Sequence, residues 1–182
     1  VFASADLAQM KNVADAGNAG ESETFARNLP VVVVPKSGSP VATFEDLAKS
    51  GVRLVLAGPE VPIGKYAREI LTKASAANGG ISADFSDKVL ANLLSNEANV
   101  KAVLTKVQLG EADAGIVYTT DAAVAKNDVT VVDIPEAYNV IAQYPIAALT
   151  DAKNAAGAAA FVAFVTGDKG QAILEKYGFG NP

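Results

Sequence analysis

One segment, VRLVLAGPEVPIGKYAREILTKA at 52–74, restricts the fold more than any other part of the chain. It opens with an apolar, β-branched run that predicts a buried strand. Gly58-Pro59 and Pro62 then interrupt the pattern, and apolar residues recur at helical spacing over 65–73. A strand, a Pro/Gly turn and a helix start are what doubly wound α/β proteins use to aim free backbone N–H groups at an anion.

The first turn of that helix is predicted at Ile63-Gly64-Lys65. A contact made by backbone N–H groups needs no particular side chain, so an apolar residue such as Ile63 is compatible with a binding site. The alternative is an ordinary connection between a strand and a helix that binds nothing. The segment alone leaves both interpretations open.

Composition excludes several classes of function. The chain has 182 residues, half of them apolar, which suits one large domain or two small lobes. It contains no cysteine and no histidine, so disulfides, thiol nucleophiles and the commonest general base and metal ligand are absent. A net charge of −5 argues against nucleic acid or an anionic membrane surface as a partner. No stretch reaches the roughly 20 apolar residues of a membrane span.

The rest of the chain alternates between strand and helix patterns. Strands are predicted at 1–5, 31–34, 114–118, 129–134 and 140–149. Helices are predicted at 7–14, 44–49, 85–94, 100–107, 154–165 and 166–177, with a short alanine helix capped by Thr120-Asp121 and a loop at Asn78-Gly79-Gly80. This alternation indicates an α/β protein, and we expect a mostly parallel sheet with helices on both faces.

Two further sites join the first as candidates. Asn99 is a preferred N-cap, and the N–H of Val100 follows it at a helix start. Tyr118 ends a short buried strand and offers a phenol O–H. These groups are neutral donors, and they suit a small, fully ionised oxyanion. The alternatives are a plain N-cap for Asn99 and a strand-end tyrosine with its hydroxyl in water.

Charged residues near these sites point to no other chemistry. Lys65 and Arg68 could steer an anion toward the site, or they could lie on a solvated helix face. We expect the solvated helix face for both residues. Asp87, Glu97 and Glu111 are expected at the surface, and no spacing of carboxylates suggests an acid/base pair. Neither a Walker motif nor GxGxxG occurs. The chain is therefore not expected to be an enzyme.

The chain resembles the periplasmic molybdate-binding proteins of ABC transporters. The resemblance runs over residues 1–182 and rests on several patterns in order: VFASAD at 1–6, VVVVPKSGSP at 31–40, LAKSGVRLVLAGPEVPIGKYARE at 47–69, NEANVKAVLTKVQLGEADAGIVYTTDA at 96–122, YPIAAL at 144–149 and GQAILEKYGF at 170–179. It implies a two-lobed, class II periplasmic-binding-protein-like α/β fold. Residues 1–35 and 144–182 would form lobe one, and residues 36–143 lobe two.

The resemblance also implies a ligand and a site. Ile63 matches the family's N–H donor in VPxG, Val100 the N–H donor after the helix cap, and Tyr118 the phenol donor, with Gly64 and Asn99 in support. The ligand would be molybdate or tungstate, held as its oxyanion with no side chain bound directly to the metal and no cofactor. The partner would be the membrane permease of an ABC importer. The location would be periplasmic or otherwise extracytoplasmic, with a signal peptide that is not in this chain.

The chain departs from the family at its start. Family members begin earlier, with an Ala-Ala-Ser and a Gly-Ser pattern whose serines donate from the opposite lobe, and these patterns are missing here. Lobe one is therefore expected to be incomplete and to expose apolar surface, which favours association. Two alternatives follow: a truncated form that binds anion weakly or not at all and associates as a domain-swapped homodimer, and a ligand-sensing or enzymatic domain on the same fold.

Overall fold

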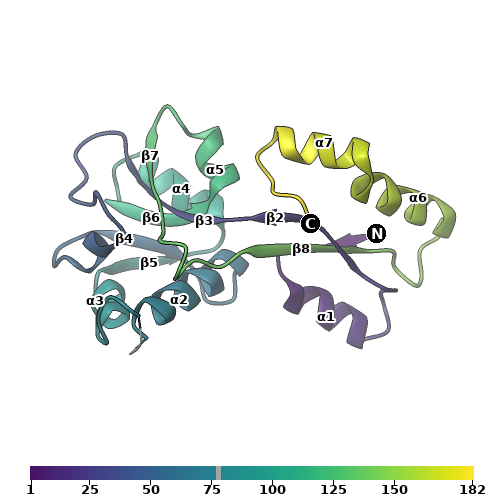
Figure 1. Cartoon of the computed structure of the whole chain (residues 1–182), viewed down its shortest axis with the longest axis horizontal. Helices are drawn as coiled ribbons and strands as arrows, with labels where there is room; N and C mark the ends of the chain where they lie inside the picture. Colours follow the sequence, from purple (N-terminus) through teal and green to yellow (C-terminus); the bar gives the residue numbers. More distant parts are fainter. Residues whose placement is uncertain (77–78) are drawn as a thin grey trace. The chain divides into compact units, whose positions relative to one another are not determined.

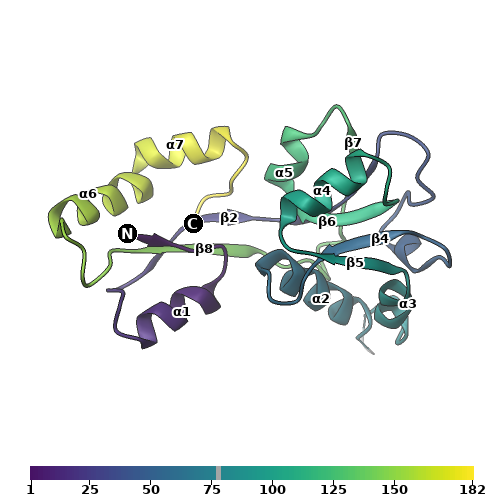
Figure 2. The same cartoon turned by 180° about the vertical axis from the view of Figure 1, so that it is seen from behind.

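A computed structural model describes residues 1–76 and 79–182, so Asn78 of the predicted loop lies outside the described residues (Figures 1 and 2). The chain divides into two compact units. Unit 1 contains Val1–Asn28 and Ile141–Pro182, and unit 2 contains Leu29–Val140. Both units combine strands with helices, which confirms the predicted α/β class.

Unit 2 is built on a five-stranded sheet in the order β5-β4-β6-β3-β7. The strands are β3 (Pro30–Pro35), β4 (Leu54–Ala57), β5 (Leu93–Glu97), β6 (Ala114–Tyr118) and β7 (Val129–Val132). β4 pairs in parallel with β5 and β6, whereas β3 lies antiparallel between β6 and β7. The predicted parallel arrangement therefore holds around β4, and β3 runs against its neighbours.

Helices cover both faces of this sheet. On one side lie α2 (Pro62–Ala74) and α3 (Phe85–Ala91), and on the other α4 (Val100–Gln108) and α5 (Thr119–Val124), while the short 3-10 turn η1 spans Glu45–Ala48 (Figure 1). Val31 to Val34 of β3 are buried, as predicted for a strand covered on both faces. Gly110 has φ +70° just after α4, and it ends that helix as predicted.

β5 was not predicted. Leu93 and Leu94 continue the helical spacing of Val89 and Leu90, so the pattern placed them in α3. In the structure α3 ends at Ala91, and the next residues pair in parallel with β4. Pairing with an already buried strand therefore overrides the local helical pattern.

Unit 1 contains a three-stranded sheet in the order β1-β8-β2, formed by β1 (Phe2–Ala3), β8 (Ala142–Ala147) and β2 (Glu23–Asn28). Both pairings are antiparallel, so the prediction of a mostly parallel sheet is wrong for this unit. The helices are α1 (Leu7–Asp15), α6 (Ala155–Thr166) and α7 (Asp168–Lys176), with α1 on one side of the strands and the other two opposite (Figure 2). Tyr144 packs against Phe25 and Phe179 in the core.

The boundary between the units lies earlier than the predicted break after residue 35. β3 pairs with β6 and β7, so Pro30–Pro35 belongs to unit 2 rather than to the first lobe. The return to unit 1 falls after Val140. The prediction placed the break at the turn-rich segment KSGSP at 36–40, but that segment follows β3 within unit 2.

Unit 1 exposes apolar side chains, as the sequence predicted. α6 has no charged residue, yet Phe161 is 53% and Phe164 46% exposed, while Ile173 and Tyr177 from the following segment are 50% and 66% exposed. Exposed apolar side chains favour association when they form a contiguous surface. Among the described residues, no helix combines the length and apolar character that crossing a bilayer requires.

Candidate functional site

The ends of three neighbouring strands bring the predicted site residues to one edge of the unit 2 sheet. Ala57 at the end of β4 lies opposite Glu97 at the end of β5, and Val55 lies opposite Gly115, so β6 ends beside them at Tyr118. α2, α4 and α5 begin just after these strand ends. We call this edge, with the first turns of the three helices, the C-terminal edge. Such edges are where open α/β sheets bind ligands.

The first turn of α2 presents backbone donors at this edge. Val61 is the N-cap, and its apolar side chain makes no capping hydrogen bond. Pro62 follows at the first helical position. The first intrahelical hydrogen bond runs from Lys65 N to Val61 O at 3.0 Å. The N–H groups of Ile63 and Gly64 precede that bond, in the part of a helix whose donors have no intrahelical acceptor.

Gly64 sets how closely α2 approaches β4. A Cβ at this position would overlap the carbonyl oxygen of Gly58 and lie 2.5 Å from that of Ala57. Both neighbours are backbone atoms, so neither can move aside without shifting the strand end. The glycine in VPIG is therefore needed for the close contact between helix and strand.

The start of α4 is capped by Asn99, as predicted. Its side-chain oxygen accepts from Ala102 N at 3.0 Å. Val100 follows the cap at the first helical position, so the Asn99 side chain leaves the Val100 N–H to other acceptors. The ordinary N-cap role of Asn99 and a donor role for Val100 are thus compatible.

Tyr118 ends β6; the residue is only 6% exposed and its hydroxyl oxygen is buried. The alternative of a strand-end tyrosine with its hydroxyl in water is therefore wrong. Its backbone N–H donates to Asp121 Oδ2 at 3.2 Å. Burial raises the pKa of Asp121, although that hydrogen bond and nearby Lys101 of α4 act to lower it.

Arg68 is not on a solvated helix face, contrary to expectation. Its guanidinium lies half-buried beneath the first turn of α2, where Nη1 donates to Gly64 O at 2.7 Å and to Ala57 O at 3.0 Å. Nη2 donates to Asn96 Oδ1 on β5 at 2.6 Å. One side chain thus connects α2, the end of β4 and the end of β5. Lys65, by contrast, is exposed.

Glu97 is also less exposed than predicted, with 12% of its side chain accessible. Its Oε1 accepts from Lys106 Nζ at 2.7 Å and from Ser95 Oγ at 2.5 Å. These hydrogen bonds, with Lys106 the stronger, hold the pKa of Glu97 below its usual value. Lys106 therefore neutralises the carboxylate that ends β5, which reduces its repulsion of an anion at the C-terminal edge.

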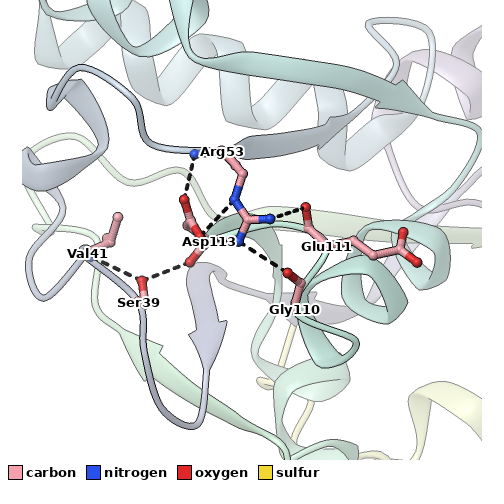
Figure 3. Close-up of polar contacts among 6 residues, drawn as sticks. All are labelled: Ser39, Val41, Arg53, Gly110, Glu111 and Asp113. Atoms are coloured by element: carbon pink, nitrogen blue, oxygen red, sulfur yellow. Dashed lines mark hydrogen bonds and ion pairs between the residues drawn. The ribbon is translucent and has the colours of Figure 1, made fainter.

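The opposite edge of the sheet is held by Arg53 and Asp113 (Figure 3). Asp113 accepts from the Arg53 backbone N at 2.9 Å and from its Nη2 at 2.6 Å, and the guanidinium also donates to the carbonyls of Gly110 and Glu111. Burial acts to raise the pKa of Asp113, but the hydrogen bonds from Arg53 lower it overall. These contacts between Arg53 and Asp113 align the start of β4 with the start of β6. They therefore also align the ends of the two strands at the C-terminal edge.

Two features of the C-terminal edge were missed by sequence reasoning. The position of the Arg68 guanidinium beneath α2 could have been inferred from the sequence. Arg68 lies four residues after Gly64, and long side chains on helices lean toward the N-terminus. No sequence pattern indicated the ion pair of Glu97 with Lys106, because this pair depends on β5, a strand that was not predicted. The described residues contain no cluster of three or more acidic side chains arranged to hold a metal ion.

Known proteins resemble this chain along its length. Residues 1–180 match the family described as bacterial extracellular solute-binding protein. The molybdate-binding protein ModA of Mycobacterium tuberculosis is 41% identical, over 100% of this chain and 66% of that protein. The putative ABC transporter substrate-binding lipoprotein YvgL of Bacillus subtilis is 36% identical, over 98% and 66%. The chain thus spans about two thirds of the length of these relatives.

A solved structure is similar as well. The substrate binding domain of a putative molybdenum ABC transporter from Clostridium difficile is 30% identical and superposes with a TM-score of 0.75, over 100% of this chain and 76% of that one. The predicted fold of a two-lobed binding protein is thereby confirmed.

Proposed function

The chain belongs to the bacterial extracellular solute-binding protein family, and from that premise we propose that it binds molybdate or tungstate for an ABC importer. The observation that supports this ligand most is the set of neutral donors at the C-terminal edge. Two relatives are named for molybdate or molybdenum, and a third for an ABC transporter. Their roles in transport favour a binding protein over the enzymatic or sensing alternative.

The proposed contacts are the backbone N–H groups of Ile63 and Val100 and the phenol of Tyr118. Each donates to a charged oxygen, and such hydrogen bonds contribute roughly 1.5–3 kcal/mol each. The N-terminal ends of α2 and α4 add the favourable field of the helix dipole. Because all three groups are hydrogen-bond donors, the site suits a tetrahedral dianion that has no proton of its own to donate. Sulfate has the same charge and shape, and its smaller size is the expected basis of discrimination.

Tyr118→Phe tests this proposal. We expect the variant to bind molybdate roughly tenfold to a hundredfold more weakly, because one hydrogen bond to a charged oxygen is lost. Titration calorimetry measures the affinity. Tyr138→Phe is the matched control, since the Tyr138 hydroxyl donates to Gly79 O at 3.0 Å elsewhere in unit 2. Equal affinity in the Tyr118 variant and the wild type would remove the phenol from the site.

Partner and location follow from the same family. The proposed partner is the membrane permease of the importer, and the proposed location is outside the cytoplasmic membrane, in the periplasm or its equivalent. The B. subtilis relative is named a lipoprotein, which supports an extracytoplasmic position. Reconstitution of transport with and without this chain tests the partnership: transport that is independent of the chain would contradict it.

The exposed apolar side chains of unit 1 favour a second candidate function, in which the chain acts as an associated homodimer. Phe161 and Phe164 on α6 would be covered if two copies associated, by domain swapping or by simple contact, and such a form would bind anion weakly or not at all. Light scattering over a range of concentrations measures the mass directly. A constant monomer mass together with tight molybdate binding would exclude this candidate.

A further inference from the structure

Arg68 is a cation placed next to the proposed donors without being one of them. Its Nη1 lies 2.7 Å from the oxygen of Gly64, the residue that follows Ile63. The same atom contacts Ala57 O, and Nη2 contacts Asn96 Oδ1. The guanidinium therefore lies behind the first turn of α2, on the side where the turn presents carbonyl oxygens, while the N–H groups of that turn face the other way.

The position of this charge matters because the chain as a whole is acidic, with a net charge of −5. Acidic residues at or beside this edge include Glu97 at the end of β5, Glu60 in the turn before α2 and Asp121 in α5. Glu97 is neutralised by Lys106. Burial lowers the pKa of Arg68, and the nearby charge of Glu60 offsets only part of that effect. An arginine remains protonated despite such a shift. Arg68 therefore supplies a permanent positive charge beside a set of neutral donors.

From this arrangement, and resting on the proposed function, we propose that Arg68 is a positioning and specificity-determining residue. It fixes the first turn of α2 against β4 and β5, and its charge favours a doubly charged tetrahedral anion over a singly charged one. The charge acts through space, without contact with the anion. This attraction scales with the charge of the anion, so its loss lowers the affinity for a dianion by the square of the factor by which it lowers that for a monoanion.

Tungstate and perrhenate separate the effect of charge from that of shape, because both are tetrahedral oxyanions of similar size and perrhenate carries one charge fewer. In Arg68→Met we expect tungstate affinity to fall roughly a hundredfold and perrhenate affinity roughly tenfold. Arg68→Lys keeps the positive charge but loses the planar guanidinium. The preference of this variant for tungstate over perrhenate should therefore remain close to that of the wild type. Lys73→Met is the matched control, since it removes an exposed charge from the same helix.

The positioning role has a readout that needs no anion. The amide of Lys65 forms the first hydrogen bond of α2, to Val61 O at 3.0 Å. Its hydrogen exchange should be faster in Arg68→Met than in the wild type or in Lys73→Met. Equal losses for tungstate and perrhenate in Arg68→Met, or unchanged exchange at Lys65, would overturn the inference. A wild-type chain that binds neither anion would instead contradict the proposed function, and the exchange measurement would still decide whether Arg68 positions the turn.

Discussion

Gly64→Ala is expected to lower the free energy of unfolding of unit 2 by about 3 kcal/mol or more and to abolish oxyanion binding. The added Cβ would overlap Gly58 O and lie 2.5 Å from Ala57 O, and neither backbone oxygen can move without disturbing β4. Relief therefore requires the first turn of α2 to shift. That shift would also break the hydrogen bonds of Arg68 and displace the N–H of Ile63.

Urea unfolding measures the stability change, and titration with molybdate measures the binding. Gly20→Ala is the matched control, because a Cβ at Gly20 meets only Ala148 O at an ordinary 3.6 Å. We expect this control to unfold close to the wild-type midpoint. If Gly64→Ala were as stable as Gly20→Ala and bound molybdate normally, close contact between α2 and β4 would not be what places the donors.

The fold could be predicted where the local pattern and the tertiary environment agree. The apolar run of β4 with its Pro/Gly turn, and Val31 to Val34 between prolines, gave strands where the structure has them. The prediction missed β5, because Leu93 and Leu94 continue the spacing of the preceding helix and the segment becomes a strand only by pairing with β4. The antiparallel sheet of unit 1 could not be predicted either, because strand direction depends on how distant segments pair.

The candidate site was predictable to the extent that it consists of backbone groups. Gly64 and Asn99 have local roles, close approach and N-capping, and these can be recognised in a sequence. Arg68 was assigned to solvent because its sequence neighbours show only a helix face. Helix spacing could indicate only the contact with Gly64 O, because the other two acceptors, on Ala57 and Asn96, come from β4 and β5.

Val100→Pro removes one proposed donor while leaving the helix in place. Proline is favoured at the first helical position, and its missing N–H has no intrahelical acceptor there. The preceding residue, Asn99, has φ −163° and ψ 168°, an extended conformation that a following proline accepts. Val100→Ala is the matched control, since it shortens the side chain and keeps the N–H. We therefore expect both variants to unfold near the wild-type midpoint.

Calorimetric titration of these two variants with molybdate tests whether backbone N–H groups at helix starts hold the anion. Loss of one hydrogen bond to a charged oxygen predicts that Val100→Pro binds about tenfold to a hundredfold more weakly than Val100→Ala, which should match the wild type within about threefold. Equal affinities in the proline and alanine variants, with both folded, would contradict the account.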